Sequence, residues 1–359
     1  MTYQRYYDTT KKESPLGLQE TKGSFQLRGV VTGTEKDSFY RELTTKTGKP
    51  MRMISFGVSV NKGKTVYTRL NGMERESVYY SKTTKQGDKK TTDVQKVAWA
   101  NRFKYRQEHD DYNLIGVHLG IEKTIDEKGD TVNNKKTMVE YDACKEISER
   151  LEDEAPVFIQ GNIEYSTYEG KHRTNFVPGQ ISLCKPIDFD SEKFEELAVF
   201  TQTIVFMGIE KRDKEQDFLV TGKVITYNSI EDVEFTIIRP ELAKKLKTLK
   251  PYTAIKVFGD IVVENSTTEV EDDNDGWGVN RMERVNSPTI WKLVITGADP
   301  SSIDTELYPK AAVEAAMAKL AVDNAAKSDF GSTDNDDWGT PKTANKAADE
   351  DDDDIVENW

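Results

Sequence analysis

The chain has 359 residues, of which 36% are hydrophobic and 31% are charged, and its net charge at pH 7 is −13. This length predicts two domains, and the low hydrophobic share predicts that part of the chain lacks a packed core. No apolar run approaches the roughly 18 residues of a membrane span, and the N-terminus lacks the apolar stretch of a secretory signal. The two cysteines, Cys144 and Cys184, lack metal-ligand spacing. We therefore expect a cytoplasmic protein without a membrane partner.

The charge is distributed unevenly along the chain. Residues 1–106 hold 22 Lys and Arg against 10 Asp and Glu, whereas residues 329–359 hold 2 Lys against 11 Asp and Glu. A uniformly acidic protein would repel nucleic acid, but it is the charge of the local surface that decides binding. The basic front part is therefore expected to bind an anionic partner.

In chain order, residues 1–23 are expected to form a flexible arm that carries basic and aromatic side chains. Alternating apolar residues then predict three strands, with a long polar loop over 34–50 between the first two. The polar stretch 81–93 predicts a mobile loop or an extended hairpin, and 94–106 fits a helix or a strand equally well. The strands expected in this half, before its helix, are 25–33, 51–60, 65–73 and 114–121.

Helical spacing of apolar residues predicts a helix over 141–154, and 155–183 predicts two strands joined by a turn at Glu169-Gly170. The second half repeats this order, with Pro240 at a favourable first position of its helix. The elements expected there are strands at 217–228 and 233–238, a helix at 240–249, a strand at 253–265, an acidic insert at 266–287 and a last strand at 289–297.

A glycine in the middle of a long strand occurs in both halves. Gly161 follows Leu151 by ten residues and Gly259 follows Leu249 by ten residues, and each leucine is the last apolar residue of a predicted helix. A mid-strand glycine permits the kink or bulge with which a small barrel turns a corner. We therefore predict a mainly β fold with two tandem OB-like five-stranded barrels, over 24–186 and 199–300, with two unspecified small β domains as the alternative.

The C-terminal part differs from the barrels in composition. Residues 304–327 predict a helix whose narrow apolar face, Val313, Met317 and Leu320, is expected to pack on the second domain or on a neighbouring subunit. Residues 328–359 predict a disordered acidic tail, because the six consecutive acidic residues at 349–354 repel each other and have nothing to bury.

No catalytic constellation is found in the sequence. It has no Gly-rich phosphate loop, and His109, His118 and His172 fit no metal-binding spacing. We therefore expect no enzymatic activity, no cofactor and no metal.

The front domain instead interleaves basic and aromatic residues. Proteins that bind single strands stack bases on aromatic faces, each worth roughly 1–3 kcal/mol, while Lys and Arg follow the phosphates. Tyr67 and Arg69 share a strand face, whereas an inward position for Phe56 is as compatible with the pattern as an outward one. The second domain lacks this interleaving. The candidate DNA-binding residues are Tyr40, Arg41, Arg52, Phe56, Tyr67, Arg69, Tyr80, Trp99, Phe103, Lys104, Arg106, Tyr165, Tyr168, Lys171 and Arg173.

Three short acidic segments contain tryptophan. DNDGWG at 273–278 and DNDDWG at 334–339 are nearly identical, and the chain ends in ENW. We interpret them as interchangeable linear motifs, for one partner protein or for the chain's own basic groove. The candidate partner-binding residues are Trp277, Trp338, Asp352, Asp353, Asp354, Ile355 and Trp359.

The stretch APVFIQGNIEYSTYEGKHRTNFVPGQISL (155–183) and the tail resemble the single-stranded DNA-binding proteins of bacteria and their phages. In that family, an apolar run, a glycine, an aromatic residue and a Gly-Lys/Arg turn form the hairpin that grips DNA. The family tail closes with Asp-Asp-Asp-Ile-Pro-Phe, and Asp352 to Ile355 match its first four positions. Val356 then replaces the proline, and Trp359 replaces the terminal phenylalanine.

The resemblance implies a non-enzymatic, sequence-nonspecific binder of single-stranded DNA whose acidic tail recruits replication, recombination and repair proteins. It also implies the host cytoplasm if a phage encodes the chain. The alternatives are an RNA-binding OB protein, and a protein-interaction adaptor whose tail mimics DNA on a host enzyme. A homo-oligomer is compatible with the sequence, which does not fix the oligomeric state.

Overall fold

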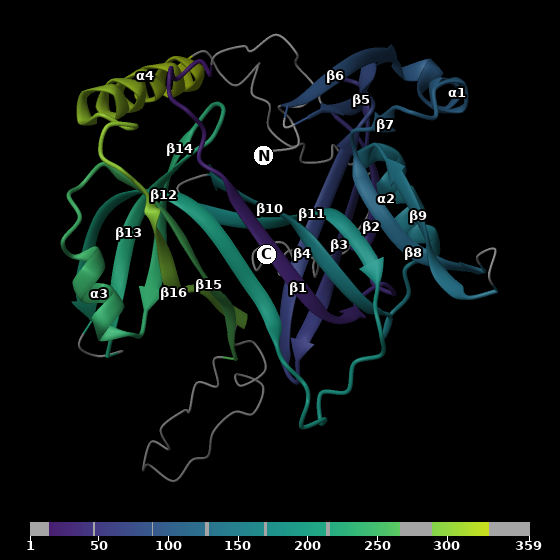
Figure 1. Ribbon diagram of the computed structural model, residues 1–359. Helices are drawn as coiled ribbons and strands as arrows, with labels where there is room; N and C mark the ends of the chain where they lie inside the picture. Colours follow the sequence, from purple (N-terminus) through teal and green to yellow (C-terminus); the bar gives the residue numbers. More distant parts are fainter. Residues whose placement is uncertain are drawn as a thin grey trace, which may run out of the picture.

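Strands dominate the computed structural model, and four α-helices accompany them in the residues that it describes (Figure 1). Those residues are 14–45, 47–87, 89–125, 129–168, 171–212, 216–265 and 289–329. The mainly β composition follows the prediction.

Five strands of the first half pair in a closed cycle, in the order β1-β3-β4-β11-β10 and back to β1. The β4–β11 pairing is parallel, and the other four are antiparallel. Helix α2 follows β4 through a long insert and packs against β3 and β4. The bounds are β1 Gly23–Thr32, β3 Pro50–Asn61, β4 Lys64–Met73, α2 Glu140–Arg150, β10 Pro156–Tyr168 and β11 Lys171–Leu183. A short strand, β2 Tyr40–Thr44, pairs with β3 where the sequence predicted only a loop.

The second half repeats the same cycle with β12, β13, β14, β16 and β15. Here too one pairing is parallel, between β14 and β16, and a helix, α3, precedes the fourth strand. The bounds are β12 Leu197–Arg212, β13 Asp217–Ile225, β14 Ile230–Ile237, α3 Pro240–Leu246, β15 Thr253–Asn265 and β16 Thr289–Asp304.

The two mid-strand glycines confirm the repeat. The pairing register shifts between Gln160 and Gly161 in β10, and between Phe258 and Gly259 in β15. A Cβ atom on either glycine would lie 1.9 Å from a backbone carbonyl oxygen of the neighbouring strand. Each bulge therefore needs a residue without a side chain, as predicted.

The two cycles join through their first strands. β1 and β12 pair antiparallel, with Phe25 opposite Phe200. These two residues are equivalent, because Phe25 also faces Gly161 and Phe200 also faces Gly259. The halves are thus related by an approximate two-fold axis, and they lie side by side in one continuous sheet (Figure 1).

An insert distinguishes the first half. Residues 74–139 separate β4 from α2, whereas only residues 238–239 separate β14 from α3. The insert holds the predicted extended hairpin, and 94–106 proves to be the end of a strand followed by helical turns. Its small core contains Val78, Tyr80, Val97 and Val139. The elements are β5 Ser77–Gln86, β6 Lys89–Ala98, η2 Trp99–Asn101, α1 Arg102–Glu108, β7 Asn113–Leu114, β8 Val117–Ile125 and β9 Thr131–Met138.

Helix α4, Lys310–Asp329, covers part of the second half together with residues 14–22 (Figure 1). Leu16 and Leu18 are buried against α4 and the second cycle, so these residues are not part of a flexible arm, and that prediction is wrong for them. The helix packs on the second domain, but Ala316 rather than Met317 lies on its buried face with Val313, and Met317 is 37% exposed. The apolar face therefore follows i, i+3 spacing.

Candidate nucleic-acid interface

Strand β4 presents alternate side chains to the core and to the surface. Val66, Thr68 and Leu70 are buried, and the residues between them, Tyr67 and Arg69, are only partly buried. The prediction that Tyr67 and Arg69 share a face is confirmed. Gly57 lies opposite Tyr67 on β3, where a Cβ would meet the Thr65 and Thr32 methyl groups at 2.6 and 2.8 Å and the Tyr67 Cε1 atom at 3.2 Å.

Three arginines from three strands meet around this face. Arg41 on β2, Arg69 on β4 and Arg173 on β11 form what we call the arginine cluster. Burial lowers the pKa of Arg69, and repulsion by the charges of Arg173 and Arg41 lowers it further. The Arg69 Nε atom donates to the Met53 sulfur at 3.0 Å, and no carboxylate of the described residues forms an ion pair with it. Like charges held together in this way favour binding of an anion.

The hairpin of β10 and β11 has two distinct faces. Arg173 pairs with Ser166, and so both lie on the face turned toward the arginine cluster. Tyr165, Thr167 and Phe176 alternate with them and occupy the opposite face, which we call the back of the hairpin. The hairpin therefore separates a cationic front from a back turned toward the second half.

Three predicted DNA-binding aromatics are buried, and the prediction is wrong for them. Phe56 packs in the core, 6.4 Å from Phe39 ring to ring. Tyr80 is fully buried in the core of the insert, where its hydroxyl donates to the Arg102 carbonyl. Tyr165 is buried in the back of the hairpin, and burial raises its pKa. None of these rings has a face open to a base.

Tyr40 and Arg52 lie away from the arginine cluster. Arg41 sits between Tyr40 and Glu42 on β2, so strand alternation turns it to the other face. Tyr40 donates to Glu42, and the Arg52 Nε atom pairs with the same carboxylate at 3.0 Å. The Arg52 guanidinium also lies 3.9 Å over the Tyr141 ring of α2. The structure thus does not bring these two predicted residues to the site.

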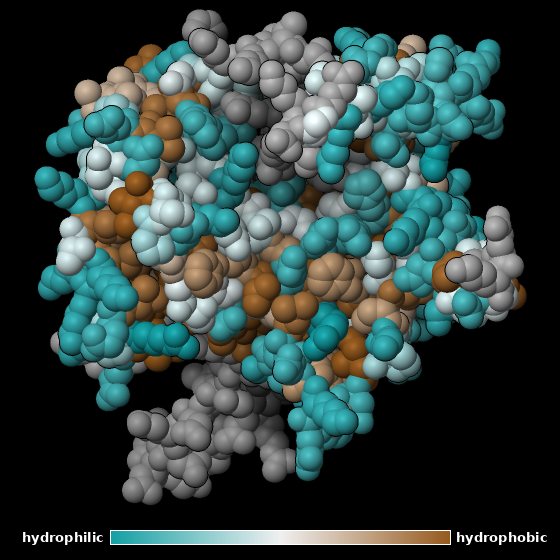
Figure 2. Space-filling view, in the orientation of Figure 1, coloured by the Kyte–Doolittle hydropathy of each residue, from teal (hydrophilic) through white to brown (hydrophobic). Residues whose placement is uncertain are grey.

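The insert forms a second basic and aromatic surface. Arg102 lies 4.3 Å over the Trp99 ring and 4.3 Å over the Phe103 ring, and Asp142 holds it at 2.8 Å. Phe103 is 58% exposed. Figure 2 shows hydrophilic side chains gathered over β5, β6 and α1. Arg102 was missed by sequence reasoning, although its place between two aromatic residues of a basic stretch was a signal.

The other basic residues of α1 are engaged in local contacts. Lys104 pairs with Glu108 at 3.6 Å, and Arg106 donates to the Thr137 carbonyl at 3.5 Å. Both remain exposed, so their charges still contribute to the potential of this surface.

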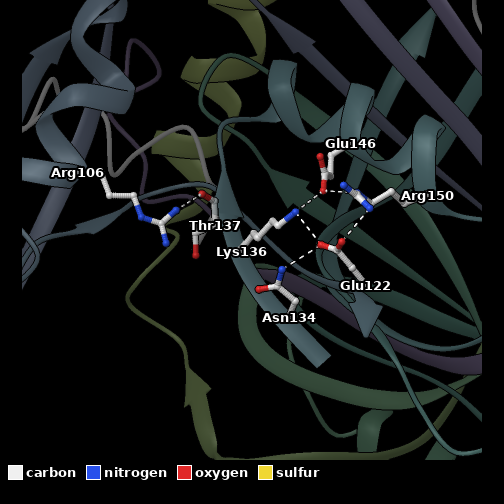
Figure 3. A network of polar contacts seen from close by, with 7 residues as sticks. All are labelled: Arg106, Glu122, Asn134, Lys136, Thr137, Glu146 and Arg150. Carbon is white, nitrogen blue, oxygen red and sulfur yellow. Dashed lines mark hydrogen bonds and ion pairs between the residues drawn. The ribbon is translucent and has the colours of Figure 1, made fainter. Parts of the chain in front are cut away.

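A compact ionic network ties β8 and β9 to α2 (Figure 3). Lys136 pairs with Glu122 at 2.9 Å and with Glu146 at 2.8 Å, and Arg150 pairs with the same two carboxylates. Hydrogen bonds from Lys136 and Asn134 lower the pKa of Glu122. These cations are neutralised within the chain, in contrast to Arg69.

The second cycle lacks the aromatic and basic pair that the first cycle carries at Tyr67 and Arg69. Counting along the paired strands from Phe25 and Phe200, Tyr67 corresponds to Glu234, and Arg69 corresponds to Thr236. Glu234 is exposed. Asp232, on the same face, is paired with Lys223 at 2.5 Å. The second cycle therefore carries an exposed carboxylate, Glu234, at the place of Tyr67.

The YorF family model matches residues 89–333, which is more than half of the sequence. The chain belongs to the YorF family. The match begins in β6, so Arg173 lies within it and Arg41 and Arg69 lie before it. No curated protein matches the chain.

Two solved structures with which this YorF-family chain aligns are of the single-stranded DNA-binding protein from Thermus aquaticus. A deletion mutant aligns with a TM-score of 0.36 and 10% identity, over 81% of this chain and 98% of that one. The wild-type protein aligns with a TM-score of 0.36 and 11% identity, over 78% of this chain and 93% of that one. At these scores the likeness supports no argument about fold or function.

Several predicted residues of this YorF-family chain lie outside the part that the structure describes. These are the residues of the arm before Ser14, the side chains of Tyr168 and Lys171, and the proposed motifs with Trp277, Trp338, Asp352, Asp353, Asp354, Ile355 and Trp359. Within the described residues, no group of His, Cys, Asp and Glu could hold a metal ion. None of the described helices is long and apolar enough to cross a membrane.

Proposed function

We propose that the first strand cycle is an OB-like barrel that binds single-stranded DNA without sequence preference. The observation that carries this proposal is the arginine cluster beside Tyr67. A guanidinium pairs with a phosphate through charge-assisted hydrogen bonds. A phosphate among Arg41, Arg69 and Arg173 would replace their repulsion with attraction.

The aromatic residues favour a single strand over a duplex. Tyr67 lies two residues from Arg69 on the same face, and Phe103 exposes its ring on the insert. Bases of a single strand can stack on such rings, whereas bases of a duplex are already stacked on each other. Stacking and phosphate contacts tolerate any base, so they support binding without sequence preference.

The two cycles have different roles in this proposal. Glu234 repels phosphates at the place that corresponds to Tyr67, so we assign DNA binding to the first cycle alone. The second cycle then serves as an OB-like scaffold. The acidic tail over 328–359 would recruit replication and recombination proteins through its aspartates and Trp359, as the family resemblance implies. No catalytic step is part of the proposal.

The test is a fluorescence anisotropy titration with labelled oligo-dT, duplex DNA and poly-U RNA. The full chain should bind oligo-dT more tightly than duplex. Arg69→Gln should weaken oligo-dT binding roughly 10- to 100-fold, the range expected for a hydrogen bond to a charged group. Arg150→Gln is the matched control, because its guanidinium is neutralised by Glu122 and Glu146.

Two results would contradict the proposal. Equal affinity for oligo-dT and duplex would remove the argument for single strands, and unchanged binding by Arg69→Gln would remove the site. Tighter binding to poly-U than to oligo-dT would favour the RNA-binding alternative.

A further inference from the structure

The back of the β10–β11 hairpin is attached to the second half of the chain. The Thr167 hydroxyl donates to the Glu231 carboxylate on β14 at 2.6 Å. The Phe176 ring packs edge-to-face against Trp291 on β16, with 5.4 Å between ring centroids. Both contacts join elements that lie far apart in sequence, so the second cycle supports the hairpin from behind.

Glu231 is only 8% exposed, and a carboxylate this buried depends on its hydrogen bonds. Among the residues that the structure describes, Thr167 is the one that donates to it. A hydroxyl has a single hydrogen, so Thr167 must accept from the His172 Nδ1 atom, which lies 2.9 Å from the same oxygen. A hydrogen-bonded chain therefore runs from His172 through Thr167 to Glu231.

This series of hydrogen bonds starts at His172, one residue away from Arg173 of the arginine cluster. His172 and Thr167 are paired across the two strands on the back of the hairpin, and Arg173 follows His172 on the front. A two-stranded hairpin on its own is only marginally stable in water, so contacts at its back hold its backbone in place, and with it the backbone of Arg173. A binding group that is fixed beforehand loses less entropy when it meets its ligand.

We propose that Thr167 and Glu231 are positioning residues through which the second cycle holds Arg173 close to Arg69. This inference rests on the proposed function, since it assigns the second cycle a part in DNA binding although its own equivalent face is acidic. Thr167 and Glu231 make no contact with DNA in this account. They act through Arg173 alone.

The test is a double-mutant cycle on oligo-dT binding. Thr167→Val removes the hydroxyl and keeps the shape of the side chain. It should weaken binding about three- to tenfold. Removal of an arginine that itself contacts the phosphate should cost more, roughly tenfold or greater. In an Arg173→Gln background the same change should have less than about a twofold effect, because coupled residues do not add. Glu231→Gln keeps an acceptor and should weaken binding less than Thr167→Val.

The matched control is Thr83→Val, which breaks an exposed hydroxyl pair with Thr92 on the β5–β6 hairpin and should bind as the unchanged chain does. Additive effects of Thr167→Val and Arg173→Gln, or full binding by Thr167→Val, would overturn this inference while the unchanged chain still binds oligo-dT. Equal binding of oligo-dT and duplex DNA by the unchanged chain would overturn the proposed function and this inference together. Melting temperatures of all variants show whether each one folds.

Discussion

Replacing all three residues of the arginine cluster by glutamine should weaken DNA binding without lowering the stability of the fold. Each phosphate contact on a single strand changes the slope of log K against log salt by about 0.7, so three lost contacts should make the slope shallower by about 2. Between roughly 50 and 200 mM salt, the unchanged chain should therefore lose about 20-fold more affinity than the variant with Arg41, Arg69 and Arg173 replaced.

The stability of this variant should not fall with its DNA affinity. Repulsion by Arg41 and Arg173 lowers the pKa of Arg69, so the native state contains unfavourable charge interactions that the variant removes. The free energy of unfolding should stay unchanged or rise, by no more than about 1 kcal/mol. Anisotropy titrations and urea unfolding measure the two quantities. An unchanged salt slope, or a loss of several kcal/mol in stability, would refute the reasoning.

Four further results are expected. Phe103→Ala should weaken oligo-dT binding by about 1–3 kcal/mol in the same titration, because its exposed ring would no longer stack on a base. Gly161→Ala should lower the melting temperature strongly and Gly208→Ala much less, since only the first Cβ would meet a backbone oxygen at 1.9 Å. Tyr165→Phe should raise the unfolding free energy by about 1 kcal/mol in urea, because its buried hydroxyl has no hydrogen-bond partner among the residues that the structure describes. Glu122 has a lowered pKa in the folded state, so its ionised form stabilises the fold above the unfolded pKa of about 4.3, and this stabilisation is lost as pH falls through the folded pKa. Glu122→Gln should therefore lower the unfolding free energy at pH 7 and lower it less at pH 3.

Strand alternation made part of the site predictable. It placed Tyr67 and Arg69 on one face because every second residue of β4 is apolar and buried. The same rule places Phe56 with Ile54 and Val58 on the apolar face of β3, since Ser55 and Ser59 alternate with them, and that face is the buried one. Alternation alone could not tell which of Tyr40 and Arg41 faces the cluster, because that depends on the register with β3.

Long-range contacts account for most of what the sequence did not reveal. Nothing near Thr167 points to Glu231, which is 64 residues away and belongs to the other cycle. The approximate two-fold axis between the halves brings these residues together, and that axis follows from the β1–β12 pairing. Leu16 and Leu18 were a different case, because their alternation was present in a stretch that was expected to be flexible.

Photo-crosslinking of oligo-dT to the full chain, followed by mapping of the crosslinked peptides, tests the central claim most directly. The account predicts crosslinks on β2, β4 and β11 around Arg41, Arg69 and Arg173, and on α1 at Phe103, all suppressed by excess unlabelled oligo-dT. Crosslinks concentrated on β13 and β14 of the second cycle would contradict it.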